Sequence, residues 1–272
     1  MKHFILFLLT GVLMASGLLA QIPDPELLSG MKPRNIGPGG MSGRVTAIDV
    51  QFSNPSIIWV GTASGGLWRS NGGGTTWEPV FDNEKVAGIG ALAIDQNKPD
   101  VVWVGTGEGN PRNSLTGGYG IYKTLDGGKN WKVMGLENTR YIHRIIIHPL
   151  NSDIVYAGAI GSPWGSSNDR GVYKTTDGGK TWKQILFVNE YSGVADMIID
   201  PFNPDKIYVA MWEHMRQPWF FKSGGSGSGL YLTVDGGENW KKVEAKDGIP
   251  AGELGRIGLA ASKNKAGCVY AI

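Results

Sequence analysis

The sequence predicts an all-β fold, a β-propeller built from four-stranded antiparallel blades. A short phrase that ends in tryptophan occurs four times, and each interval between copies holds four short segments rich in Val, Ile, Tyr and Trp. The 42 glycines, against 14 prolines, mark tight turns between these apolar segments. The copies are about fifty residues apart, and a repeat of this length with four strands per unit is typical of a propeller, in which each unit forms one blade.

The four units share one order of strands. The first strands are RVTAIDV from Arg44, ALAID from Ala91, HRIIIH from His143 and DMIID from Asp196. The second strands, apolar on both faces as expected between neighbouring blades, are IIWVG, VVWVG, IVYAG and KIYVA. The third strands are GLWRS, GIYKT, GVYKT and GLYLT, and the fourth are TWEPV, NWKVM, TWKQI and NWKKV. The expected blades span approximately 44–82, 86–136, 140–188 and 192–245.

A fifth unit begins near residue 254 and reaches its second strand, CVYAI, at Ile272. Four blades alone would leave apolar blade faces and a strand edge uncovered, and propellers close with about four to eight blades. We therefore expect a truncated chain, the N-terminal part of a larger protein. Further C-terminal blades or domains of that protein would then be partners of this segment.

The repeated phrase occurs as TLDGGKNW, TTDGGKTW and TVDGGENW, and it matches the Asp-box pattern Ser/Thr-x-Asp-x-Gly-x-Thr/Asn-Trp. The Asp can accept hydrogen bonds from the turn between the third and fourth strands, and the glycine permits a positive φ there. The tryptophan is expected to pack between adjacent blades. A structural role is therefore predicted for Asp126, Trp131, Asp177, Trp182, Asp235 and Trp240. Gly72 replaces the Asp in the first unit, whose turn should be the loosest.

The N-terminus predicts export. Lys2 and His3 precede an apolar run and then small residues, the pattern of a secretory signal peptide over residues 1–20, followed by a lead-in segment over 21–43. The apolar run is short for a membrane anchor. We expect a protein that is secreted, periplasmic or at the cell surface of a bacterium, with no membrane span after cleavage. Cys268 is the only cysteine, so no internal disulfide can form.

The connections between second and third strands are the expected functional face. In a propeller they lie together with the connections between blades, on the face opposite the Asp-box turns. Here they span residues 61–66, 105–120, 158–171 and 210–229 and carry most of the unusual polar and aromatic residues. The candidate ligand-binding residues are Glu108, Asn110, Arg112, Asn113, Trp164, Trp212, His214, Arg216 and Trp219.

Each candidate group has a structural alternative. The polar residues of 108–113 could bind sugar hydroxyls or a peptide, or Glu108 could pair with Arg112 and brace the loop. The three tryptophans could form a platform for a glycan ring or an apolar side chain, or pack the loops onto each other. His214, beside Glu213 and Arg216, could titrate or bind a carboxylate, or be polar filling.

The sequence predicts no metal site and no cofactor, because it contains no His/Asp/Glu cluster at metal spacing and no nucleophile elbow. The net charge of +2 without a basic block gives no support for a nucleic-acid partner. Glu108 and Glu213 are the best local carboxylates for catalysis, but no catalytic pair can be placed. Arg44, Arg144 and Asp196, in the innermost strands, could line the central channel or form salt bridges.

The phrases NIGPGGMSGRVTAIDV, VGTGEGNPRNS and AMWEHMRQPWFFKSGGSGSGLY resemble secreted bacterial proteins with sortilin-like, neuraminidase-repeat propellers, often labelled glycosyl hydrolases. The resemblance covers essentially the whole chain after the signal peptide. It implies a multi-bladed propeller that recognises a peptide, a protein or a glycan.

Two related enzyme groups match less well. The chain is more distantly similar to double-propeller xyloglucanases, whose catalytic Asp position is occupied by Ala63 in GTASGGLWRS. Sialidases need an arginine triad, for which Arg44, Arg144 and Arg256 are scattered candidates. A ligand-binding module is therefore the preferred interpretation. The alternatives are a glycoside hydrolase with acids partly in missing blades, and a structural module of a larger surface protein.

Overall fold

The computed structural model describes residues 24, 26 and 44–272. The predicted signal peptide (1–20) lies outside the described residues, as does nearly all of the predicted lead-in segment (21–43). The chain divides into two compact units, Met1–Ile36 and Gly37–Ile272. All the described strands lie in the second unit.

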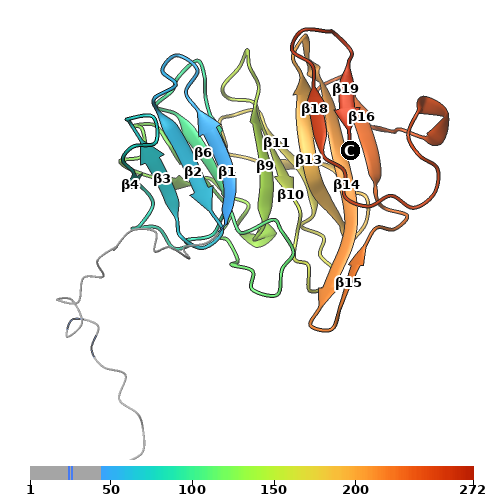
Figure 1. Cartoon of the computed structure of the whole chain (residues 1–272), viewed down its shortest axis with the longest axis horizontal. Helices are drawn as coiled ribbons and strands as arrows, with labels where there is room; N and C mark the ends of the chain where they lie inside the picture. The colour runs from blue at the N-terminus through green and yellow to red at the C-terminus, as the bar shows by residue number, and fades with distance from the viewer. Residues whose placement is uncertain (1–23, 25, 27–43) are drawn as a thin grey trace, which may run out of the picture. The chain divides into compact units, whose positions relative to one another are not determined.

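The first three blades are four-stranded antiparallel sheets whose strands follow in chain order (Figure 1). The first blade contains β1 (Val45–Val50), β2 (Ile58–Thr62), β3 (Leu67–Ser70) and β4 (Glu78–Pro79). The second contains β5 (Ile89–Ile94), β6 (Val102–Thr106), β7 (Ile121–Thr124) and β8 (Lys132–Val133). After the short helix η2 (Glu137–Thr139), the third contains β9 (Ile142–Ile147), β10 (Val155–Ala159), β11 (Gly171–Thr175) and β12 (Lys183–Leu186). The predicted all-β fold of four-stranded antiparallel blades is confirmed.

The fourth blade carries an additional strand. Its sheet contains β13 (Ser192–Asp200), β14 (Asn203–Gln217), β16 (Gly229–Thr233) and β17 (Lys241–Lys242). The sequence analysis expected a loop over 210–229, but β14 continues to Gln217 and pairs with β15 (Phe220–Ser223). This segment is rich in Trp and Phe, which favour extended strands, and the hairpin extends beyond the other blades (Figure 1).

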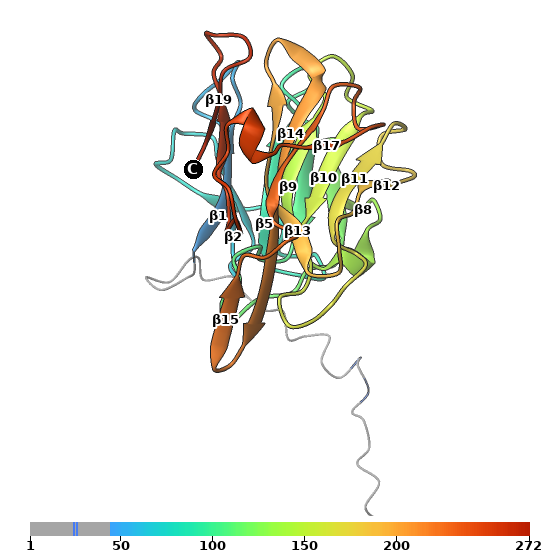
Figure 2. The ribbon, with the colours of Figure 1, turned by 90° about the vertical axis from the view of Figure 1, so that its right-hand side faces the viewer.

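The beginning of a fifth blade follows. After the helix η3 (Ala245–Asp247), β18 (Leu259–Ala261) and β19 (Val269–Ala271) form a two-stranded antiparallel sheet. The innermost strands contact one another in the order β1, β5, β9, β13 and β18, so successive sheets pack face to face (Figure 2). Between the sheets lie hydrophobic clusters that contain the buried Trp59, Trp103 and Tyr156 of the second strands.

Each complete Asp-box turn is held by its carboxylate. Asp126 Oδ1 accepts hydrogen bonds from the Asn130 backbone N–H at 2.9 Å and from the Thr124 hydroxyl at 2.7 Å, while Oδ2 accepts from the Asn130 amide at 2.7 Å. Equivalent bonds surround Asp177 and Asp235. Hydrogen bonds from the side chain and then the backbone of Asn130, together with the bond from the Thr124 hydroxyl, lower the pKa of Asp126 to about 2. In the first blade Gly72 offers no carboxylate, and the Ser70 hydroxyl accepts from the N–H groups of the turn.

Trp131 and Trp182, which follow the turns of the second and third blades, each fasten their blade to the preceding one. The Trp131 indole N–H donates to the carbonyl of Val80 at 2.6 Å, and its ring meets Trp59 edge-on at 6.3 Å. The Trp182 indole N–H likewise donates to the carbonyl of Met134 at 2.7 Å, and its ring meets the Trp103 ring edge-on with a centroid distance of 6.1 Å. Each contact joins two blades, because the carbonyl and the second ring belong to the preceding one.

Glycine is required where the turn meets the preceding blade. Gly128 and Gly179 have φ values of +89° and +95°, which side chains rarely adopt. A Cβ atom there would also lie 2.8 Å from the Trp59 ring and 2.5 Å from the Trp103 ring, respectively. The second glycine of the Asp-box therefore permits both the turn and the close approach of the blades.

The fastening role can be measured by replacing tryptophans. Trp182→Ala is expected to lower the free energy of unfolding by about 3 kcal/mol, because it opens a cavity between two blades. Trp77→Ala is the matched control, since Trp77 is 37% exposed and should cost about 1 kcal/mol or less. Chemical denaturation of both variants gives the comparison. Equal losses would contradict the interblade role.

Candidate functional site

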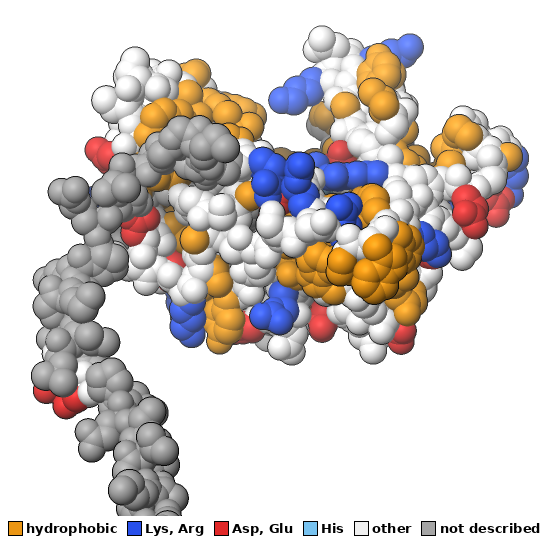
Figure 3. All heavy atoms as spheres, turned by 60° about the horizontal axis from the view of Figure 1, so that its bottom comes forward, with side chains coloured by type: hydrophobic (Ala, Val, Ile, Leu, Met, Phe, Trp, Pro, Cys, Tyr) orange, Lys and Arg blue, Asp and Glu red, His pale blue; other side chains and the backbone are white. Residues whose placement is uncertain are grey.

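The face that carries the second-to-third-strand connections lies at the bottom in Figure 1, with the β14–β15 hairpin projecting from it. Figure 3 turns this face forward and shows Lys and Arg side chains near its middle, beside a group of hydrophobic side chains. The sequence analysis placed the candidate ligand-binding residues on this face. Their contacts divide them into an internal framework and an exposed group.

Bulges shape the ends of the innermost strands on this face. In each blade one residue of the innermost strand has no partner opposite it; these are Thr46, Gly90, His143 and Ala195. Such a bulge bends a strand and changes the direction of neighbouring side chains. The bulge at His143 precedes Arg144, and the one at Ala195 precedes Asp196.

Arg44 and Glu108 form a bidentate ion pair. Arg44 Nε and Nη2 lie 2.8 and 2.6 Å from the two oxygens of Glu108. Glu108 is only 1% exposed, whereas Arg44 is partly exposed. The hydrogen bonds that Arg44 donates to Glu108 raise the pKa of Arg44, although burial acts to lower it. The partner of Glu108 is thus Arg44 in the first blade, whereas the sequence analysis had considered Arg112, which is exposed.

Arg144 and Asp196 form a second ion pair, across the third and fourth blades. Arg144 Nε lies 2.7 Å from Asp196 Oδ1, and Asp196 Oδ2 accepts the Leu259 N–H of β18 at 2.9 Å. A cavity of about 240 Å³ runs along the innermost strands, and Arg144 and His143 line it. Arg144 therefore both lines this inner cavity and forms a salt bridge, the two roles that the sequence analysis had left open.

Arg256 connects His143, which lines the inner cavity, to Asn110 of the second blade. Its Nη1 donates to Asn110 Oδ1 at 2.9 Å, its Nη2 lies 2.9 Å from His143 Nε2, and its guanidinium lies 5.4 Å from the centroid of the Trp212 ring. Because Nε2 accepts this bond, His143 is neutral and carries its proton on Nδ1. Burial, then the charges of Arg144 and Arg256, lower the pKa of His143 well below its usual value. No Asp or Glu among the described residues forms an ion pair with Arg256.

Arg170 organises the third-blade connection from inside. It is fully buried, and its guanidinium donates to the carbonyls of Ile160 and Ser162 and approaches His214 Nδ1 at 3.5 Å. His214 stacks on Trp212 with a centroid distance of 4.4 Å. Burial and the charge of Arg170 lower the pKa of His214 to about 3, so the ring is neutral. Trp212 itself is only 3% exposed.

Glu213 is held by several donors. Its carboxylate accepts from Lys222 at 2.7 Å, from the Gly227 N–H at 3.0 Å and from the Asn189 amide at 3.4 Å. Burial acts to raise the pKa of Glu213, but the bonds from Lys222, Gly227 and Asn189 together lower it. A general acid in a glycosidase needs a raised pKa. The lowered pKa of Glu213 does not suit a general acid. Its contacts with Lys222 and Gly227 instead stabilise the β14–β15 hairpin.

The exposed part of the candidate set is aromatic. Trp164 is 40% exposed and Trp219 is 80% exposed, and Phe220 and Phe221 lie next to Trp219 with partly exposed rings. We call these four residues the aromatic rim. They come from the third-blade connection and from the β14–β15 hairpin.

Arg216 joins the segments around the rim. Its Nε donates to Asn113 Oδ1 at 2.8 Å, its backbone N–H donates to the Pro163 carbonyl at 2.7 Å, and its guanidinium lies 5.1 Å from the centroid of the Phe221 ring. Three connections from three blades are therefore tied together beneath the exposed rings. The sequence analysis did not propose His143 or Arg170 as site residues, and it named Arg256 only for the sialidase comparison. His143 and Arg256 act through a contact between distant parts of the chain, which leaves no local pattern. Arg170 bonds mainly to carbonyls of its own connection, in a segment without a recognisable motif.

Neither a metal nor a membrane site is indicated in residues 24, 26 and 44–272. No group of three His, Cys, Asp or Glu side chains there could hold a metal ion. The same residues contain no helix with the length and apolar character to cross a bilayer.

Comparison with known proteins confirms the predicted resemblance. A family model for sortilin-Vps10 (sortilin, neurotensin receptor 3) matches residues 119–249. A xyloglucanase of Paenibacillus sp is 25% identical, with a match covering 91% of this chain and 26% of the relative. An oligoxyloglucan-reducing end-specific xyloglucanase of Emericella nidulans is 23% identical, covering 74% and 24%. The chain therefore spans about a quarter of the length of these curated relatives.

The solved structures show the same fold. The GH74 enzyme of Niastella koreensis superposes with a TM-score of 0.60 at 19% identity, over 83% of this chain and 33% of that one. At this identity the likeness supports the propeller fold and carries no conclusion about activity.

The buried histidines give the site a measurable pH dependence. The pKa of His214 is lowered to about 3 from 6.5, so its contribution to stability is complete above pH 6.5 and is lost as the pH falls below it. The shift of His214 is expected to make the unfolding free energy about 2 kcal/mol lower at pH 5 than at pH 7. Urea denaturation at both pH values measures this difference.

The matched variant is His214→Gln, which should remove this increment. An NMR titration that gives His214 a pKa near 6.5 would contradict the buried, neutral assignment.

Proposed function

We propose that this chain is a carbohydrate-recognition module that binds a neutral oligosaccharide segment of a polysaccharide across the aromatic rim. The single observation that carries this proposal is the exposure of Trp164 and Trp219 beside a framework whose carboxylates Glu108, Asp196 and Glu213 are already paired. Exposed indole rings supply rigid, amphipathic surfaces for recognition and lose little conformational entropy on binding. The predicted signal peptide agrees with export of such a module.

Charge favours a neutral ligand over a cationic one. Glu108 and Asp196 are each neutralised by an arginine, and Glu213 by Lys222. His143 and His214 are uncharged. Asn110, Asn113 and the arginines that bind their amide oxygens provide N–H groups suited to sugar hydroxyls. A basic peptide would find these carboxylates already paired with cations.

The relatives add an indication of the ligand. Two of them are named as xyloglucanases, so we infer that a β-glucan backbone with side chains, such as xyloglucan, is the first ligand to test.

A glycoside hydrolase is the alternative, favoured by the names of those relatives. It would require acids partly outside this sequence, because Glu108 and Glu213 are both occupied by cations. Ala63 also stands where the similar xyloglucanases have a catalytic Asp. A peptide or protein ligand remains the other class that a sortilin-like propeller suggests.

Binding can be measured with xyloglucan oligosaccharides by isothermal titration calorimetry. Trp219→Ala and Trp164→Ala are each expected to weaken binding about tenfold, since an anchoring aromatic contributes at least about 1.4 kcal/mol. Trp77→Ala, on an Asp-box turn of the opposite face, is the control and should bind like the parent. Binding of peptides without binding of any glycan would contradict the proposal. Hydrolysis of xyloglucan that disappears in Glu213→Gln would establish the alternative.

A further inference from the structure

One Asn-Gly pair occurs in the sequence, Asn71-Gly72, at the Asp-box turn of the first blade. Asparagine is chemically labile, and a following glycine favours loss of the side-chain amide because glycine has no Cβ to obstruct attack by its own backbone nitrogen. The reaction needs a side chain that is free to rotate and a backbone N–H that can leave its acceptor. The repeated turns differ in both respects.

The Asn71 side chain is free to rotate. It is exposed, and its amide takes part in no hydrogen bond or ion pair within residues 44–272. The same position of the other turns holds Leu125, Thr176 and Val234, all of them exposed. Exposure at this position is therefore a property of the turn and does not depend on which blade carries it.

The backbone nitrogen that would attack Asn71 is held weakly. The Gly72 N–H donates to the Ser70 hydroxyl at 3.2 Å, at the long end of the usual range, and the same oxygen accepts the Gly74 N–H at 2.8 Å. Closing a five-membered ring between Asn71 and Gly72 therefore breaks one long, shared hydrogen bond.

The three complete Asp-box turns contain Asp-Gly pairs in which both reacting groups are held. The Asp177 carboxylate accepts from the Thr181 N–H at 3.0 Å and from the Thr181 hydroxyl at 2.6 Å, while the Gly178 N–H donates to the Asp153 carbonyl at 3.0 Å. The other two complete turns have the equivalent bonds. A ring between Asp177 and Gly178 can form only after several of these bonds have opened.

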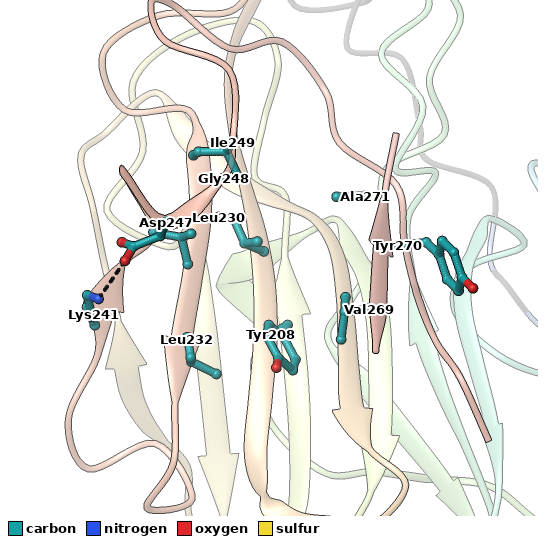
Figure 4. Close-up of a pocket in the computed structure, with 11 residues that line it drawn as sticks. Tyr208, Leu230, Leu232, Lys241, Asp247, Gly248, Ile249, Val269, Tyr270 and Ala271 are labelled. Carbon is teal, nitrogen blue, oxygen red and sulfur yellow. Dashed lines mark hydrogen bonds and ion pairs between the residues drawn. The ribbon is translucent and has the colours of Figure 1, made fainter. Parts of the chain in front are cut away.

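A further Asp-Gly pair, Asp247-Gly248, is held in the same two ways (Figure 4). The Asp247 carboxylate accepts from Lys241 at 3.3 Å and from the Glu244 N–H at 3.1 Å. The Gly248 N–H donates to the Ala245 carbonyl at 3.1 Å. This pair is therefore protected as well.

Two asparagines precede serine, another small residue, and both of their side chains are bound. Asn113 Oδ1 accepts from Arg216 Nε at 2.8 Å, and Asn151 Oδ1 accepts from the Asp153 N–H at 3.0 Å. Within residues 44–272, Asn71 is thus the asparagine that combines a following glycine with an unbound side chain.

We propose that Asn71 is a site of spontaneous deamidation. The Gly72 nitrogen attacks Asn71 Cγ, so that an N–Cγ bond forms and the Cγ–Nδ2 bond breaks. Nδ2 leaves as ammonia and carries away the proton that the Gly72 nitrogen loses. Water then opens the cyclic imide at either carbonyl, which yields aspartate, or isoaspartate with the main chain running through Cγ. Both products add one negative charge to the turn, on the face opposite the aromatic rim.

The experiment incubates the full chain in 18O-labelled water at mildly alkaline pH, both folded and in guanidinium chloride, and follows each asparagine by mass spectrometry of proteolytic peptides. Incorporated 18O marks opening of the ring by water. Asn71 is expected to convert in the folded protein within about threefold of its rate in the denatured chain, because exposed turns open at little cost. Asn113 and Asn151 should each convert at least about tenfold more slowly when folded than when denatured.

Asp177→Asn is the matched control, because it places a second Asn-Gly pair in a turn that holds both reacting groups. The new amide keeps an oxygen for the Thr181 N–H. In guanidinium chloride this pair should convert as fast as Asn71, but in the folded protein at least about tenfold more slowly, since at least one hydrogen bond must open first. Asn71→Thr, which introduces the residue type of the third blade, should abolish conversion at the first turn.

An Asn71 that stays intact in the folded protein while the denatured chain converts would overturn the proposal. Equal rates at Asn71 and at position 177 of the folded Asp177→Asn protein would also overturn it, as would conversion of Asn113 or Asn151 as fast as Asn71. The comparison with Asn113 and Asn151 uses the unmodified chain, so it decides the question even if Asp177→Asn destabilises the fold.

Discussion

The indole N–H that Trp131 and Trp182 each donate to a carbonyl of the preceding blade is the interaction on which the rest of the structure depends. Trp131 and Trp182 place one ring between two sheets and satisfy a main-chain acceptor at the same time. The Asp carboxylate holds the turn that positions the ring, and the second glycine allows the turn to approach the neighbouring aromatic side chain. A twisted sheet packed on its neighbour in this way fixes the position of the next sheet, and the contact then repeats.

This arrangement leaves the opposite face available for function. The fastening residues occupy the turns between third and fourth strands, so the connections between second and third strands can lengthen without disturbing the blades. Arginine side chains hold these connections in fixed positions. Arg170 satisfies carbonyls inside one connection, Arg216 joins three connections, and Arg256 joins the second blade to the segment before β18. The rigid framework presents Trp164 and Trp219 to solvent.

The sequence predicted the blades well because their pattern is local. Alternating apolar strands, Asp-box turns and the repeat length each occur within one unit, and strand pairing between neighbours in the chain follows from them. The site was predicted only in outline, because its decisive contacts join distant residues. Arg44 and Glu108 are 64 residues apart, and Arg256 lies 113 residues from His143. The β14–β15 hairpin was missed because its Gly-rich surroundings resemble a loop, whereas its aromatic residues favour pairing.

The most direct test of this account follows the indole N–H signals of a 15N-labelled protein by NMR during titration with a xyloglucan oligosaccharide. The account requires that the signals of Trp164 and Trp219 move, while those of Trp131 and Trp182 stay in place because their indole N–H groups are bonded to the preceding blade. Movement of these two interblade signals, with Trp164 and Trp219 unchanged, would contradict it.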